Sequence, residues 1–89
     1  MKITDEKPNK ACLTTKYVMY DDSPIISVYY DDDGDWQFLG KEEVGEEDAF
    51  VLSIEQILEH DPTLKDLPNL NIGQSAYRDN FNSPWCIEN

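Results

Sequence analysis

The chain has 89 residues and carries 19 Asp and Glu against 7 Lys and Arg, for a formal net charge of -12. This length supports one hydrophobic core, and 39% hydrophobic and 11% aromatic content exceeds that of a disordered acidic tail. Nucleic acids and anionic membrane surfaces are excluded as partners, because both are bound through clustered Lys and Arg. Composition therefore predicts one folded acidic domain.

No apolar run approaches the roughly 20 residues that cross a bilayer, and the first residues lack the apolar stretch of a secretion signal. We therefore expect a cytoplasmic protein. In that reducing setting Cys12 and Cys86 are expected to be thiols, and a bridge between them stays open if the first and last elements lie side by side. Two Cys and one His are too few for a structural zinc site, and we expect no cofactor.

The distribution of apolar residues predicts the elements in the first third of the chain. Residues 1–10 are predicted to be a frayed polar lead, and residues 11–89 a single α+β domain. Short apolar and aromatic runs at residues 11–13 and 17–20 favour one or two strands. Residues 25–30 form the clearest strand, with apolar side chains on both faces.

A hairpin is predicted at the acidic segment that follows. Asp31-Asp32-Asp33-Gly34-Asp35 lies between this strand and a second strand-like run at residues 36–40. Gly34 can take the positive φ that a tight turn requires, so the two strands should pair in antiparallel orientation. Residues 41–48 are then expected to be a charged loop, and residues 49–52 a further strand.

Residues 53–60 carry the strongest helix signature. Ser53 and Gln56 supply the two halves of a capping box, in which each side chain satisfies an exposed amide of the other residue. The helix should end near His60, because Pro62 disfavours helical geometry at the residue before it. Apolar residues recur at helical spacing along this segment and predict one buried face: Ile54, Ile57 and Leu58.

Three further segments follow this helix. Asp61-Pro62 favours a short helical turn, and residues 72–78 are a strand candidate. Residues 79–89 are expected to be a tail that is anchored by Phe81 and Trp85.

The predicted fold class is α+β, with a small antiparallel sheet of about four strands and one main helix packed on it. The expected core consists of Trp36, Phe38, Phe50, Leu52, Ile54, Ile57, Leu58 and Leu64.

The acidic turn raises the question of a calcium site. If Asp31 begins a calcium loop, Trp36 occupies the sixth position, where glycine permits the sharp bend, and strands flank the segment where helices should stand. Placing Gly34 sixth puts Tyr29 first and Gly40 twelfth, and neither supplies a carboxylate. We therefore predict no metal site, and an acidic tip that keeps the hairpin soluble.

Catalytic signatures are missing from the sequence. His60 is the single imidazole, and its predicted place near a helix C-terminus gives it a structural role. Paired carboxylates are so abundant that no pair stands out as a general acid and base. The sequence holds no Gly-rich phosphate loop, no Gly-x-Ser-x-Gly elbow and no His-Glu-x-x-His motif. We predict a protein that is not an enzyme and has no catalytic residue.

Four motifs occur in order along the chain: Asp33-Gly34-Asp35-Trp36-Gln37-Phe38, a helix closed by Asp61-Pro62, Gly73-x-x-Ala76-x-Arg78 and Pro84-Trp85. Together they resemble the pattern of a widespread family of small uncharacterised bacterial proteins. The chain is also distantly similar to an immunity-protein domain of bacterial toxin systems. The resemblance implies a bacterial origin and a cytoplasmic setting, and it supplies no catalytic residues. Family members often carry His where this chain has Tyr30, so a role of that His does not carry over.

We expect a non-catalytic, immunity-like protein-interaction module that masks a basic partner protein, because residues 21–48 hold eleven acids against one Lys. A small-molecule or metal-responsive binding domain is the alternative, and a weak hydrolytic activity at the acidic surface is a third hypothesis. An exposed edge strand leaves a homodimer open. The predicted interaction residues are Asp31, Asp32, Asp33, Asp35, Tyr29 and Tyr30.

Overall fold

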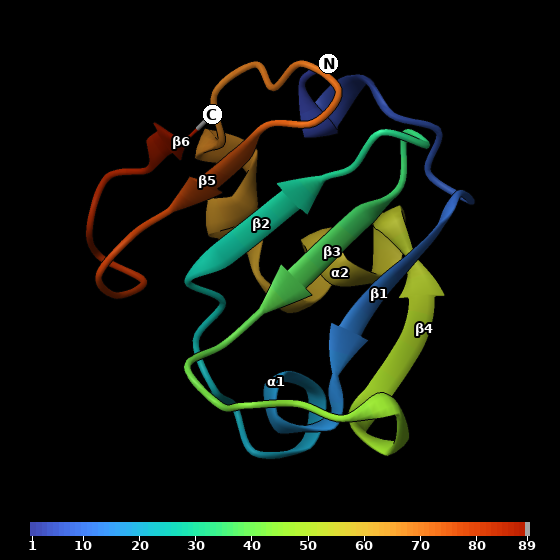
Figure 1. Ribbon diagram of the computed structural model, residues 1–89, viewed down its shortest axis with the longest axis vertical. Helices are drawn as coiled ribbons and strands as arrows, with labels where there is room; N and C mark the ends of the chain where they lie inside the picture. The colour runs from blue at the N-terminus through green and yellow to red at the C-terminus, as the bar shows by residue number, and fades with distance from the viewer. Residues whose placement is uncertain (89) are drawn as a thin grey trace.

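The computed structural model describes residues 1–88, which form one six-stranded sheet with helices packed behind it (Figure 1). The strand order is β4-β1-β3-β2-β5-β6, and every neighbouring pair is antiparallel except β1 and β3. The strands are β1 (Ala11–Thr15), β2 (Ser27–Tyr30), β3 (Trp36–Leu39), β4 (Ala49–Ser53), β5 (Ser75–Tyr77) and β6 (Cys86–Glu88). The helical elements are α1 (Lys16–Tyr20), α2 (Ile54–His60) and the 3-10 turns η1 (Ile3–Asp5), η2 (Glu46–Asp48) and η3 (Pro62–Asp66).

The predicted α+β class is confirmed, but the sheet has six strands where about four were expected. The strand candidate at residues 72–78 contains β5, whereas β6 lies in the segment expected to be a tail. A strand of three residues such as β6 carries too few alternating side chains to give a strand pattern of its own. The segment predicted to be a tail therefore supplies a sheet edge.

The predicted hairpin is confirmed. Strands β2 and β3 pair in antiparallel orientation with Tyr30 opposite Trp36. Gly34 closes the turn with a φ of 79°, a conformation that glycine adopts without a steric cost. The Asp31 carbonyl accepts from the Gly34 amide at 3.0 Å, and the Asp35 carbonyl accepts from the Asp31 amide at 2.9 Å.

The apolar run at residues 17–20 forms helix α1, so the prediction of a strand there was wrong. Thr15 ends β1 and caps this helix, because its side-chain oxygen accepts from the Val18 amide at 3.2 Å. A short apolar run fits either a strand or a buried helix, and the cap decides between them.

The capping box of α2 is confirmed, and both of its hydrogen bonds are present. Ser53 Oγ accepts from the Gln56 amide at 3.1 Å, and Gln56 Oε1 accepts from the Ser53 amide at 2.9 Å. The helix ends at His60, as predicted, and Asp61 then caps η3 by accepting from the Thr63 amide at 3.0 Å. These caps fix the two helical segments that cover the rear of the sheet.

The core lies between the sheet and this helical layer. All eight residues predicted for the core are part of it or pack against it; six are buried, and Phe50 and Leu58 are partly buried. The Trp36 ring stacks on Tyr30 at a centroid distance of 4.5 Å and lies parallel to Phe38 at 6.2 Å. The aromatic content of the hairpin thus serves mainly to fill the core.

Residues 1–10, expected to be a frayed lead, instead pack against the domain. Ile3 in η1 has no exposed surface. Glu6 Oε2 accepts from Trp36 Nε1 at 3.0 Å, and the ammonium of Lys10 donates to the Gly34 carbonyl. The composition of residues 1–10 is mostly polar, so it did not predict that Ile3, Glu6 and Lys10 hold this segment against the domain.

Both cysteines are free: Cys12 is buried in β1, and Cys86 is exposed in β6. Strands β3, β2 and β5 lie between β1 and β6, so the side-by-side arrangement that a bridge would need does not occur. Within residues 1–88, no helix has the length and apolarity required to cross a membrane.

The buried side chain of Ile3 gives the first prediction. Ile3→Ala should lower the free energy of unfolding by about 3 kcal/mol, because it removes buried apolar atoms and leaves a cavity. Urea unfolding followed by circular dichroism would measure the change. The exposed neighbouring change Thr4→Ala is the control, and an equal effect of the two substitutions would show that the lead does not contribute to the core.

The contacts of Glu6 predict a pH dependence. Burial alone would raise the pKa of this carboxyl, but hydrogen bonds from Trp36 Nε1 and the Lys7 amide, together with the charge of Lys10, lower it below the ordinary 4.5. Because the folded-state pKa is the lower one, the ionised carboxylate stabilises the fold above about pH 5, and this contribution is lost as pH falls through the folded-state pKa.

Unfolding free energies between about pH 5 and pH 3 would test this dependence. The stability advantage of the wild type over Glu6→Gln should shrink as pH falls, since Gln keeps an acceptor but cannot be ionised. Glu59→Gln, at an exposed position of α2, is the matched control and should leave the slope unchanged. Parallel curves for the wild type and Glu6→Gln would contradict the prediction.

Candidate functional site

The front of the sheet in Figure 1 is not covered by any helix within residues 1–88, and we call this surface the open face. The strand register aligns side chains across it. Val51 in β4 stands opposite Leu13 in β1, Leu13 is level with Gln37 in β3, and Gln37 stands opposite Tyr29 in β2. The row continues to Ser75 in β5. Because side chains alternate along a strand, the residues of this row point to the same side.

The open face is more apolar than a water-facing sheet surface usually is. The exposed fractions are 66% for Val51, 39% for Leu13 and 43% for Tyr29. Tyr77, two residues after Ser75 in β5, is 42% exposed. Antiparallel sheets with one solvated face normally place polar side chains there. This group of exposed apolar side chains makes the open face the candidate site.

Acidic side chains adjoin this apolar row. Asp31 and Asp35 lie two residues beyond Tyr29 and Gln37 along their strands, so they continue the same face at the hairpin. Asp31 Oδ1 accepts from the Asp33 and Asp35 amides at 2.9 Å each, which fixes the turn. Within residues 1–88, no ion pair neutralises any carboxylate of residues 31–35.

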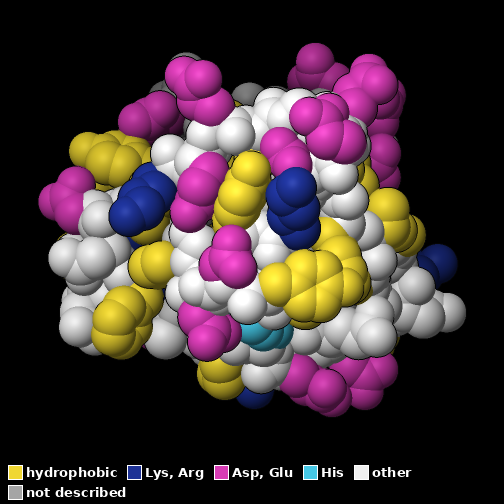
Figure 2. Space-filling view, turned by 90° about the horizontal axis from the view of Figure 1, so that it is seen from below, with side chains coloured by type: hydrophobic (Ala, Val, Ile, Leu, Met, Phe, Trp, Pro, Cys, Tyr) yellow, Lys and Arg dark blue, Asp and Glu magenta, His cyan; other side chains and the backbone are white. Residues whose placement is uncertain are grey.

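The basic residues nearby serve other contacts. Lys10 donates to the Gly34 carbonyl and lies 3.7 Å from Glu6, and Lys16 pairs with Asp48 at 2.8 Å. The hydrogen bond from Lys16 is the main reason that the pKa of Asp48 lies below its ordinary value. Seen from below, acidic side chains stand over much of the visible face and few basic ones stand between them (Figure 2). At the open face itself, no ion pair within residues 1–88 involves the carboxylates of residues 31–35.

The predicted interaction residues divide into two groups. Asp32, Asp33 and Asp35 are exposed and Asp31 is partly exposed, and the turn brings all four together with exposed Tyr29. Tyr30 is only 7% exposed and its ring stacks on Trp36, so its side chain belongs to the core and we remove it from the interaction surface.

Asp31, Asp33 and Asp35 are also the group that could ligate a metal, since one carboxylate oxygen from each lies within 4.8 Å of the others. Calcium takes six to eight oxygen ligands, of which three carboxylates supply only a part. One oxygen of Asp31 already accepts from two amides of the turn. The exposed position of the turn suits a charged surface as well as it suits a cation.

A groove opens in the open face where β1 and β3 separate. The two strands are in parallel register at only one pair, Leu13 with Gln37, and a groove of about 260 Å³ lies beside that pair. Asp31 and Asp35 stand at its acidic end. Its complete lining is Ala11, Cys12, Leu13, Asp31, Asp35, Trp36, Gln37 and Val51.

Sequence reasoning missed the apolar half of this surface. Leu13 and Val51 were taken only as parts of strands, because the sequence does not show which side of the sheet stays uncovered. In β1 the exposed positions are Ala11 and Leu13 and the buried positions are Cys12 and Thr14, so side-chain polarity does not follow exposure there. Which side of β1 stays open follows from the register with β4, which the sequence does not show.

Arg78 is the other polar centre that sequence reasoning did not single out. Its side chain is buried and its Nη2 atom pairs with Asp61 Oδ2 at 3.0 Å. Its Nη1 donates to Thr63 Oγ1 at 2.8 Å, and its Nε donates to the Ile25 carbonyl at 2.9 Å. Burial lowers the pKa of the guanidinium, and the charge of Asp61 opposes that shift.

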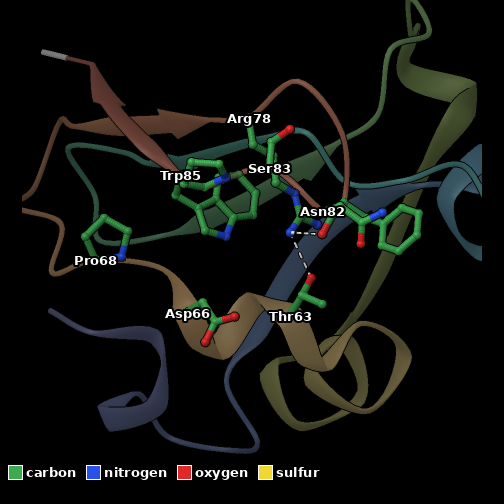
Figure 3. A pocket seen from close by; sticks show the side chains of 9 residues that line it. Thr63, Asp66, Pro68, Arg78, Asn82, Ser83 and Trp85 are labelled. Carbon is green, nitrogen blue, oxygen red and sulfur yellow. Dashed lines mark hydrogen bonds between the residues drawn. The ribbon is translucent and has the colours of Figure 1, made fainter.

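A pocket of about 490 Å³ adjoins this ion pair at the C-terminal segment (Figure 3). The Arg78 guanidinium lies 4.2 Å from the centre of the Trp85 ring. Trp85 Nε1 is buried and has no acceptor within residues 1–88. Because the guanidinium is already held by Asp61, Thr63 and backbone carbonyls, its role in this geometry is to join structural elements.

Two nucleophile candidates remain: Cys12, which lines the groove, and His60, at the end of α2. Burial raises the pKa of the Cys12 thiol to about 12, so it stays protonated at neutral pH. His60 Nε2 lies 2.9 Å from the Val18 carbonyl oxygen, which agrees with the structural role expected for it.

Comparison with protein-family models, with curated proteins and with solved structures finds no match for this chain. The resemblance to small bacterial proteins and to immunity-protein domains therefore stays a prediction.

The structural role of Arg78 can be tested by removing its charge. Arg78→Met should lower the free energy of unfolding by about 3 kcal/mol, because Asp61 is left as a poorly solvated carboxylate without its partner. Adding Asp61→Asn should recover part of the loss. Urea unfolding would measure both, with Lys65→Met at an exposed position of η3 as control. Equal losses for Arg78→Met and Lys65→Met would contradict the role.

Proposed function

We propose that this protein is a non-catalytic interaction module that binds a basic partner protein through its open face and acidic hairpin. The observation that carries the proposal is the adjacency of an exposed apolar row to carboxylates that have no cationic partner within residues 1–88. Apolar side chains supply the water-excluding centre of an interface, and the surrounding charges select the partner.

The net charge supports a basic partner over other occupants. A formal charge of -12 attracts a cationic protein over a distance of about 10 Å at moderate salt, which speeds the encounter. Two copies of this chain repel each other through the same charge, so a basic protein is the preferred occupant over a homodimer. The same charge motivates the immunity-like role of masking a basic surface, and the resemblance implies a bacterial cytoplasm as its setting.

The alternative function is a small-molecule or metal-responsive domain. The approach of Asp31, Asp33 and Asp35 to within 4.8 Å of one another favours it for a cation. A ligand of the native state raises the melting temperature, so a cation site in the turn predicts a larger rise with calcium or magnesium than with sodium at equal ionic strength. Thermal melting with and without these ions separates the two functions.

A substitution at the centre of the open face tests the proposed function. Tyr29→Lys should weaken binding to the basic partner about tenfold or more, because it replaces an apolar contact with a cation facing a cationic protein. Tyr20→Lys makes the same chemical change at an exposed position of α1, outside the row of side chains on the open face, and serves as the matched control. Both variants have the same net charge.

The measurement is capture of proteins from a bacterial lysate on the immobilised chain at about 50 and about 300 mM salt, followed by titration with the purified captured protein. We expect a basic protein that is retained at low salt by the wild type and Tyr20→Lys, released at high salt and lost with Tyr29→Lys. Retention of a neutral or acidic protein, or equal binding by both variants, would refute the proposal.

A further inference from the structure

The groove between β1 and β3 has two chemically different parts. Leu13 and Val51 contribute apolar surface on one side, and Asp31 and Asp35 contribute carboxylates at the hairpin end. The ammonium of Lys10 bonds to the Gly34 carbonyl at the same end of the two strands, and it is not among the residues that line the groove. An occupant therefore meets an apolar wall followed by negative charge.

The size of the groove limits what it can hold. Its volume of about 260 Å³ is below the range of roughly 300 to 1,000 Å³ typical of pockets that enclose a whole small molecule. One long side chain fits such a space. An aliphatic stem would be desolvated against Leu13 and Val51, and a cationic head would reach the carboxylates.

We infer that this groove receives an arginine side chain of the basic partner, an inference that rests on the proposed function of the open face. The aliphatic stem lies along Leu13 and Val51, and the guanidinium lies between the carboxylates of Asp31 and Asp35. Arginine is thereby the anchor residue of the interface, and the rest of the apolar row packs around it.

Arginine fits this arrangement better than lysine or an apolar residue. The carboxylates of Asp31 and Asp35 offer acceptors on two separate groups, and the planar guanidinium has donors on three nitrogens that can reach both. Asp35 makes no hydrogen bond through its carboxylate within residues 1–88, so it is available to a partner. An apolar side chain would bury these carboxylates without compensation.

The inference can be tested without knowing the partner. The probe is N-acetyl-arginine methylamide, and its matched neutral control is N-acetyl-citrulline methylamide, which has nearly the same shape but no charge. Titration followed by ¹H–¹⁵N NMR should shift the backbone amides of Leu13, Asp35 and Gln37 with arginine. The dissociation constant should be about 1 mM or weaker for a ligand of this size. Citrulline should cause no saturable shift.

Two variants then show which carboxylate binds the guanidinium. Asp35→Asn should weaken arginine binding about tenfold, since it removes a charge-assisted hydrogen bond. Asp33→Asn removes the same charge from the same turn, but Asp33 does not line the groove, so it should weaken binding less than Asp35→Asn does. Equal shifts with citrulline, or equal losses in the two variants, would overturn the inference, because general attraction to the acidic turn predicts both.

The two proposals fail separately. If a basic protein is captured in a Tyr29-dependent way but the arginine probe leaves the groove amides unshifted, the arginine anchor is wrong and the interaction module stands. If the arginine probe binds as expected and no basic protein is captured at either salt concentration, the groove recognises arginine and the proposed function is wrong.

Discussion

The buried guanidinium of Arg78 is the contact on which the two layers of this fold depend. It follows β5, and it joins the segment before β2, the turn η3 and the C-terminal segment through Ile25, Asp61, Thr63 and Phe81. These bonds hold the helical layer and the C-terminal segment to the sheet. A buried charge is tolerated only when such partners surround it, so the elements that supply them are held in one arrangement.

The same arrangement leaves the opposite face without cover. α2 and the turn that follows it pack behind the sheet, and residues 1–10 contribute Ile3 to the same core. Acids crowded at the hairpin repel one another and oppose folding, and Lys10 and Glu6 stabilise the hairpin from behind without neutralising them. A cost of this kind at an otherwise consistent fold is expected where a surface serves a function.

Local chemistry made much of the fold predictable. Gly34 and the capping box of Ser53 each decide a conformation within a few residues, and both predictions were confirmed. The run at residues 17–20 was misjudged because Thr15 acts as a cap, which its sequence position alone does not show. The acids of the candidate site could be named from the sequence. The apolar half of the site could not be predicted. Whether the Leu13 side chain lies on the open face depends on the register of β1 with β3 and β4, which are distant in sequence.

The place of β1 in the sheet has a consequence for how the chain acquires its structure. This strand is the first along the chain, yet it lies between β4 and β3, and its partners begin only at Trp36 and Ala49. The main-chain groups of β1 pair with segments that are more than twenty residues away in sequence. The entropy cost of closing these loops therefore comes before the stabilising contacts that the pairing provides. The β2–β3 hairpin, whose strands are neighbours in sequence, has no such delay and is the natural nucleus onto which the N-terminal strand assembles.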